Sequence, residues 1–258
     1  MTSVMFTGKN SQIGKYFTHD YEYCSYDLED SSTWDQLLDS EYVFLLLPKT
    51  PQLLELSKDF ILAAEQSRIR QIIKIGSLGP YRAIHQQLEC FMRLCRVPYT
   101  SFDIAPLMNN IFTEQYDYDT ATLENYRGQA TAPYLDPRCL AKAIESVVGN
   151  SQHYNRNYAM TGPHQLTIHQ VVESLRTGGW PVDRIHNVGY ETTHASLRSL
   201  DADHRLMKKL GSRYYTELWA PAVSKDWKLF NTDHRTLDQF IAQDVEIYTK
   251  RMELDKYL

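Results

Sequence analysis

The chain has 258 residues and a formal net charge of -5 at pH 7, which argues against nucleic acid as its main partner. Hydrophobic residues make up 43% of the sequence, which excludes an intrinsically disordered chain. The longest apolar run covers residues 42–47, far too short to span a membrane as a helix.

The first hundred residues alternate between strand and helix patterns. Short apolar or alternating segments predict strands at residues 4–6, 21–26, 42–47, 71–75 and 99–104. Apolar residues at helical spacing predict helices at residues 12–19, 34–38, 53–64 and 84–95. Repeated β-α-β units of this kind predict an α/β fold with a doubly wound parallel sheet.

The later part of the chain is less regular. Residues 114–132 are polar and rich in tyrosine, which indicates a loop near the ligand-binding edge of the sheet. We expect helices at residues 140–147 and 168–175, a strand at residues 158–160, and helical structure from Gly178 onward.

The turn after the first strand is the most informative motif. It runs from Gly8 to Gly14, and glycine allows a tight bend that brings backbone N–H groups close to a pyrophosphate. Ser11 stands where a third glycine is usual, so phosphate would approach less closely there, although its hydroxyl could replace a backbone contact. An ordinary βα turn without a ligand is the alternative. The predicted dinucleotide-binding residues of this turn are Gly8, Lys9, Asn10, Ser11, Gln12, Ile13 and Gly14.

The order of these motifs resembles the NmrA-like branch of the atypical short-chain dehydrogenases/reductases over nearly the whole chain. The segment from Thr7 to Gly14 stands in place of the family's TGxxGxxG turn, and similar segments cover residues 27–48, 97–110, 134–163 and 232–241. The resemblance implies an NAD(P)-binding Rossmann domain at residues 1–132, with strands contributed by later residues. A smaller, mostly helical substrate lobe would follow at residues 133–258, where residues 158–163 resemble strands of that lobe.

The choice between NAD and NADP depends on the second strand. The family commonly has a basic residue there for the 2′-phosphate, but no arginine or lysine lies between Lys15 and Lys49. Asp27 stands where a carboxylate could accept hydrogen bonds from a ribose diol, which favours NAD. Asp27 could equally cap the turn that follows it. Lys9 is the one nearby cation that could still serve a phosphate.

The candidate catalytic residues follow the fourth predicted strand. The superfamily's Tyr-x-x-x-Lys pair has here the form Tyr81 and His85, just after Ser77. Histidine titrates near neutral pH and can act as a general acid or base, so we expect His85, rather than Tyr81, to donate the proton and Ser77 to orient a carbonyl or amide. A solvated helix position for His85 is the alternative. Glu89, one turn later, could orient the imidazole, but we expect a plain surface pair between the two.

The nicotinamide is expected at the carboxyl ends of the strands, near Leu47, Pro48, Gly76 and Ser77. Asp103 departs from the resemblance, since an arginine is usual at its place. An acid near a cofactor phosphate would repel it, so this side chain either points away or marks an altered pocket.

The cysteines and histidines indicate no metal site. No C-x-x-C pair and no zinc-type spacing occurs, and the histidines lack partners at ligand spacing. Free cysteines without a secretory signal predict a reduced, cytoplasmic protein.

The resemblance implies an NAD(P)-dependent reductase acting on a small carbonyl-bearing or conjugated organic substrate, as a monomer or homodimer. Two alternatives remain. The first is a dinucleotide-binding redox sensor without turnover. The second is a cofactor-independent cyclase or isomerase on the same fold.

Overall fold

A computed structural model describes residues 2–6, 13–47, 52–79, 82–188 and 222–244. Six parallel strands form the main sheet in the order β2-β1-β3-β4-β5-β8. Their bounds are Thr2–Met5 (β1), Tyr21–Cys24 (β2), Tyr42–Leu46 (β3), Gln71–Ser77 (β4), Tyr99–Ile104 (β5) and Arg156–Met160 (β8). This is the predicted α/β Rossmann-like sheet.

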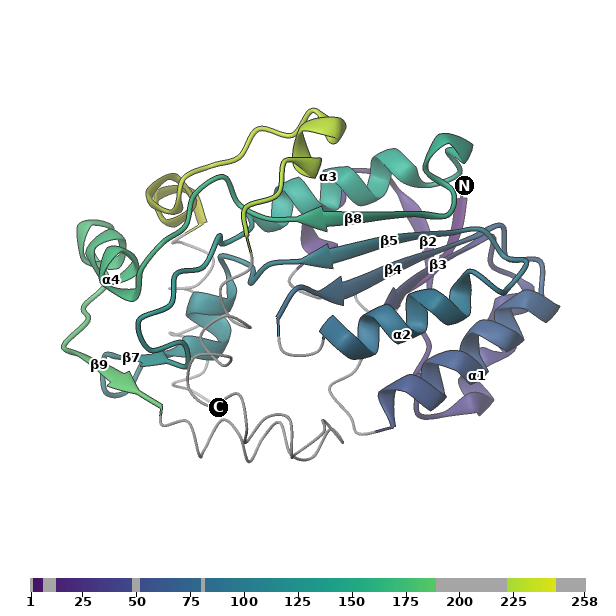
Figure 1. The fold of residues 1–258 in the computed structure, drawn as a ribbon, viewed down its shortest axis with the longest axis horizontal. Helices are drawn as coiled ribbons and strands as arrows, with labels where there is room; N and C mark the ends of the chain where they lie inside the picture. Colours follow the sequence, from purple (N-terminus) through teal and green to yellow (C-terminus); the bar gives the residue numbers. More distant parts are fainter. Residues whose placement is uncertain (1, 7–12, 48–51, 80–81, 189–221, 245–258) are drawn as a thin grey trace.

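Helices cover both faces of the main sheet (Figure 1). One face packs against α1 (Leu53–Gln66) and α2 (Arg82–Met92), and the other packs against α3 (Pro137–Val147). The central strand β3 is buried on both faces, as a continuous apolar run requires. The predicted helix around residues 34–38 is the 3₁₀ helix η2 (Ser31–Leu38), whose first turn is capped by the Asp30 carboxylate.

A second, smaller lobe lies beyond the carboxyl ends of the sheet. The arrowheads of β4, β5 and β8 point toward the side where α4, β7 and β9 lie (Figure 1). This lobe has a three-stranded sheet in the order β6-β7-β9 and its own apolar core. Its elements are a π-helical turn (Ile111–Gln115), β6 (Tyr116–Asp117), β7 (Thr122–Asn125), α4 (Ile168–Thr177), β9 (Arg184–Asn187) and a helix at residues 237–244.

Both lobes draw on both halves of the chain. β8 and α3 follow residue 132 yet belong to the main sheet and its covering layer, while β6 and β7 precede residue 132 yet belong to the small lobe. The expectation that residues 158–160 resemble a strand of the substrate lobe is therefore wrong, because β8 pairs with β5. The division into domains at residue 132 stays a prediction.

The helix predicted at residues 12–19 is wrong in its described part, which is a single 3₁₀ turn, η1 (Gly14–Tyr16). The chain becomes extended at Phe17, and the amides of Thr18 and His19 donate to the buried carboxylate of Glu145 on α3. These tertiary hydrogen bonds replace the bonds that would continue a helix.

Two further expectations are corrected in the small lobe. Residues 114–132 were expected to form a loop but include part of the π-helical turn and the strands β6 and β7. Helical structure was expected from Gly178 onward, yet β9 is a strand that pairs in parallel with β7. Its pairing partner lies about sixty residues earlier, and the exposed, polar β9 has no local pattern that would reveal such a contact.

Candidate active site

The sheet reverses its direction of growth between β1 and β3. The chain passes from β1 outward to β2, then crosses back so that β3 pairs with the other side of β1. Ligands of open α/β sheets bind outside the carboxyl ends of the strands at such a switch point. The switch point therefore lies where the sequence predicts the dinucleotide.

The structure describes only the last two residues of the predicted turn. Ile13 and Gly14, at the beginning of η1, are buried, and Leu47 is half-buried just after β3. The other predicted binding residues of the turn and two neighbouring site residues lie outside the described residues: Gly8, Lys9, Asn10, Ser11, Gln12, Pro48 and Tyr81.

Asp27 lies in an exposed turn after β2. Its Oδ1 atom accepts a hydrogen bond from the amide of Glu29 at 2.9 Å, and its carbonyl oxygen accepts one from the Trp34 indole at 2.9 Å. The carboxylate thus caps the turn, as the alternative from the sequence supposed. Its role toward a ribose stays a prediction.

Gly76 and Ser77 end β4 at the same edge of the sheet. The Ser77 hydroxyl accepts a hydrogen bond from the amide of Gly79 at 3.0 Å, which holds the turn after the strand. A Cβ at Gly76 would lie 2.5 Å from Oδ1 of Asp103 and 3.0 Å from Nζ of Lys74. Glycine at this position leaves room for a charged cluster beneath it.

That cluster consists of one lysine and two carboxylates buried between the sheet and α2. Lys74 on β4 is fully buried, and its Nζ lies 2.6 Å from Oε1 of Glu89 and 3.1 Å from Oδ1 of Asp103. The Ser101 hydroxyl accepts a hydrogen bond from Lys74 at 2.9 Å and donates one to Glu89 at 2.8 Å. Asn157 on β8 donates to the other oxygen of Glu89. We call these residues the Lys74 cluster.

Glu89 is therefore not the surface partner of His85 that the sequence suggested. It is 6% exposed and bonds to Lys74, Ser101 and Asn157. Asp103 lies near the carboxyl end of β5, and its Oδ1 atom contacts Lys74 in this cluster.

His85 lies one helical turn before Glu89 on the same buried face of α2. Its side chain is 4% exposed, so the solvated position considered as the alternative is wrong. Among the described residues its Nδ1 atom has no hydrogen-bond partner. Burial, with the nearby Lys74 charge, lowers the pKa of His85 to about 3, so the imidazole is neutral at physiological pH. The assumption that His85 titrates near neutral pH does not hold.

The pKa of Asp103 moves in the opposite direction. Burial raises it above the ordinary value and the Glu89 charge adds to this, while Lys74 and Arg82 oppose it. One buried lysine faces two carboxylates, so a protonated Asp103 makes the cluster neutral.

The small lobe contains a second buried cation with different partners. Arg127 is 6% exposed and donates from Nη2 to the Tyr134 hydroxyl and, at 3.5 Å, to Oε1 of Gln115. Its guanidinium also lies 4.6 Å from the centre of the Tyr134 ring. No carboxylate of the described residues pairs with it. We call these three residues the Arg127 cluster.

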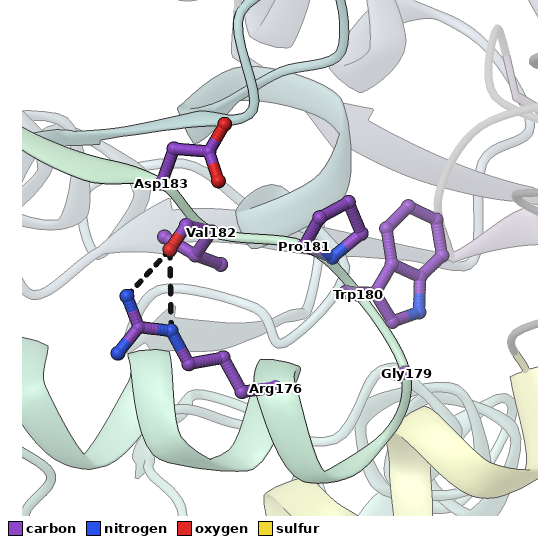
Figure 2. A pocket seen from close by; sticks show the side chains of 6 residues that line it. All are labelled: Arg176, Gly179, Trp180, Pro181, Val182 and Asp183. Carbon is purple, nitrogen blue, oxygen red and sulfur yellow. Dashed lines mark hydrogen bonds between the residues drawn. The ribbon is translucent and has the colours of Figure 1, made fainter.

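A hollow of about 490 Å³ lies at the end of α4 in the small lobe (Figure 2). The Arg176 guanidinium donates from Nε and Nη2 to the carbonyl oxygen of Val182, so its charge is turned toward the backbone (Figure 2). The hollow is lined by Arg176, Gly179, Trp180, Pro181, Val182 and Asp183. None of these lining residues has a hydroxyl or thiol side chain that could act as a nucleophile.

The described residues contain no group of three or more histidine, cysteine or acidic side chains that could hold a metal ion. The four cysteines are free thiols. Within the residues that the structure describes, no helix is long and apolar enough to cross a bilayer.

Comparisons with known proteins place this site on a familiar architecture. No family model and no curated protein matches the chain. Among solved structures, a nucleoside-diphosphate-sugar epimerase from Staphylococcus aureus superposes with a TM-score of 0.70 at 15% identity, covering 94% of this chain and 100% of its own. An NADPH-dependent quinone oxidoreductase from Escherichia coli, complexed with NADPH, gives 0.69 at 15% identity, covering 94% and 99%.

A double mutant of NmrA superposes with a TM-score of 0.65 at 13% identity, covering 99% of this chain and 91% of its own. The chain thus has the fold of NAD(P)-binding Rossmann proteins. More particularly, its fold is similar to that of NmrA itself, so the resemblance seen in the sequence is confirmed at the level of the fold.

The sequence interpretation missed Lys74 as a site residue. Lysine is almost never fully buried without a partner, and Lys74 stands between Ile73 and Ile75 in a strand expected to be covered. From this position a buried lysine with a carboxylate partner on a neighbouring element could have been predicted.

Proposed function

We propose that this protein is an NAD(P)-dependent reductase of the NmrA-like type that acts on a small carbonyl-bearing or conjugated organic compound. The observation that carries the proposal is the buried Lys74 cluster under Gly76, at the carboxyl edge of a Rossmann sheet. Titratable groups with shifted pKa values at a ligand-binding edge are typical of catalytic sites. The NADPH-bound quinone oxidoreductase with the same fold supports the choice of cofactor class.

The described residues at the switch point fit a dinucleotide. β1 and β3 are paired in parallel and run toward the same edge of the sheet, and the buried Gly14 ends the predicted pyrophosphate turn. We assign the pyrophosphate to the turn from Gly8 to Gly14 and the nicotinamide to the edge formed by Leu47, Pro48, Gly76 and Ser77. When bound, a reduced nicotinamide supplies the hydride.

The protein groups at this edge then position the substrate. Ser77 has its hydroxyl at the end of β4, where it can orient a carbonyl oxygen or the cofactor amide. His85 is neutral, so it can act as a hydrogen-bond donor or acceptor but does not carry an extra proton at neutral pH. Tyr81 remains a candidate from its spacing alone.

Steady-state oxidation of NADH and NADPH by the full-length protein, with a panel of quinones, aldehydes and ketones, tests the proposal. We expect at least one substrate to be reduced with turnover that depends on the dinucleotide. Dinucleotide binding without oxidation of any panel member would favour the redox-sensor alternative. If neither dinucleotide binds, a cofactor-independent cyclase or isomerase becomes the better interpretation.

Cofactor preference is tested at Asp27. A carboxylate that accepts from the ribose diol would favour NADH, and Asp27→Ala would then weaken NADH binding more than NADPH binding. Equal weakening of both would leave Asp27 with its turn-capping role alone.

A further inference from the structure

Asp103 is placed differently from the other carboxylate of the Lys74 cluster. It is the next-to-last residue of β5 and pairs with Gly76, so it lies at the carboxyl edge of the sheet. Its side chain is 14% exposed, whereas that of Glu89 is 8% exposed and that of Lys74 is fully buried. Asp103 is therefore the acidic group of the cluster that lies nearest to the proposed nicotinamide position.

The two carboxylates also differ in how well their anions are stabilised. Among the described residues, Glu89 accepts hydrogen bonds from Lys74, Ser101 and Asn157, while Asp103 accepts one, from Lys74. Hydrogen bonds from several donors favour the charged form of a carboxyl group. When the cluster binds one proton to become neutral, that proton belongs on Asp103.

The other groups that surround Asp103 are consistent with a proton on its carboxyl group. β4 contributes the Lys74 ammonium, and α2 contributes Glu89, the exposed Arg82 and the neutral His85. From β8 comes the neutral amide of Asn157. Burial and the Glu89 charge raise the pKa of Asp103, whereas the charges of Lys74 and Arg82 lower it. The net effect is a raised pKa.

We propose that Asp103 is the general acid of the reduction, with Lys74 stabilising the carboxylate that remains after proton transfer. This inference rests on the proposed function and names a residue that the Tyr-x-x-x-Lys pattern does not contain.

The step is balanced with a reduced nicotinamide dinucleotide as the reductant. The carbonyl carbon accepts a hydride, and the carbonyl oxygen takes the proton of the Asp103 carboxyl group. The O–H bond of Asp103 breaks, its electron pair stays on the carboxylate, and a new O–H bond forms on the alcohol product. Lys74 pairs with the carboxylate until a solvent proton restores the acid through the exposed part of the side chain.

The test compares Asp103→Asn with wild type and with Asp59→Asn, which changes an exposed aspartate on α1. Infrared spectra of the cofactor-free protein at neutral pH would report a protonated carboxyl group directly. We expect its band in wild type and in Asp59→Asn, and its loss in Asp103→Asn. NADPH binding and kcat with the best panel substrate are measured on the same samples.

We expect Asp103→Asn to lower kcat by about 100-fold or more while NADPH binding and KM change little, because general acid catalysis contributes a factor of this order. Retention of full turnover by Asp103→Asn, or absence of the protonated carboxyl band from wild type, would overturn the assignment. If Asp103→Asn does not fold, the wild-type infrared spectrum decides, because the assignment requires the band. A wild-type protein that binds or oxidises no dinucleotide refutes the proposed function itself, whatever the spectrum shows.

Discussion

Lys74 and Arg127 are both buried, but their partners among the described residues differ. Lys74 in the main sheet has two carboxylates within ion-pair distance, whereas the Arg127 side chain in the small lobe bonds, within the described part of the chain, to a phenol and an amide. Both side chains are withdrawn from solvent, so burial alone does not determine their chemistry.

The difference shows what each cluster can do. In the Lys74 cluster one buried cation faces two carboxylates, and burial, with the Glu89 charge, raises the pKa of Asp103. The Arg127 cluster keeps a permanent charge, which the Tyr134 ring and two neutral oxygen acceptors stabilise. The two clusters therefore differ in composition, since the Lys74 cluster contains carboxylates and the partners of Arg127 are a hydroxyl and an amide.

The largest expected effect comes from removing each cation in turn. Lys74→Met leaves the carboxylates of the cluster without their buried cation and should lower the free energy of unfolding by about 3–5 kcal/mol. Arg127→Met leaves no acid behind, and the remaining Tyr134 and Gln115 still bond to each other. Its cost should be about 1–2 kcal/mol. Urea denaturation of both variants measures the difference, and equal losses would break the comparison.

A glycine next to each cluster gives the second prediction. A Cβ at Gly162 would lie 1.9 Å from the carbonyl oxygen of Tyr134, which is backbone, while a Cβ at Gly76 meets the movable end of Asp103. Gly162→Ala should cost about 3 kcal/mol, and Gly76→Ala only about 1–2 kcal/mol. Thermal denaturation monitored by circular dichroism measures both. A larger loss in Gly76→Ala would mean that the carboxyl group of Asp103 cannot move aside.

The third prediction concerns the pH dependence of stability that comes from the buried His85 on α2. The pKa of His85 is lowered to about 3 in the folded protein, so between its ordinary value and about 3 the unfolded chain binds a proton that the folded chain does not. The stability due to neutral His85 is therefore present above pH 6.5 and is lost as the pH falls. From pH 6.5 to pH 5 the loss should be about 2 kcal/mol.

His85→Gln should remove this part of the pH dependence. His169→Gln, which changes an exposed histidine on α4, should leave it unchanged. Denaturation at a series of pH values compares the three proteins. An unchanged slope in His85→Gln would show that the imidazole is solvated after all.

The smallest effect is expected at the surface. Arg70 lies 2.8 Å from Glu41, but both side chains are about half-exposed. Exposed ion pairs contribute little because solvent screens them. Arg70→Gln should therefore leave the denaturation midpoint unchanged within error, and a shift as large as that of Lys74→Met would contradict the distinction between buried and exposed charges.

Much of the fold could be predicted from local pattern, because the strands and helices of the main sheet have strong apolar periodicity. The run at residues 42–47 and the stripe on α1 are examples. The short polar strand β9 could not be predicted, since its stability comes from pairing with β7. The turn at η1 depends on Glu145, a residue far along the chain that no local pattern includes.

The sequence indicated some of the candidate residues, and the others emerge only from the tertiary structure. Gly76, Ser77 and His85 were identified from their positions after the fourth strand. The charged cluster beneath them was not, because Lys74, Glu89 and Asp103 come from three elements whose facing surfaces depend on tertiary packing. A lysine in a covered strand indicates that a partner exists, but it does not say which carboxylate supplies it.

Calorimetric titration of the full-length protein with NADPH and with NADH tests the central claim most directly. The account predicts saturable heat with at least one dinucleotide, accompanied by a rise in melting temperature. Absence of heat from both titrations, with an unchanged melting temperature, would contradict the assignment of a nicotinamide cofactor to this sheet edge.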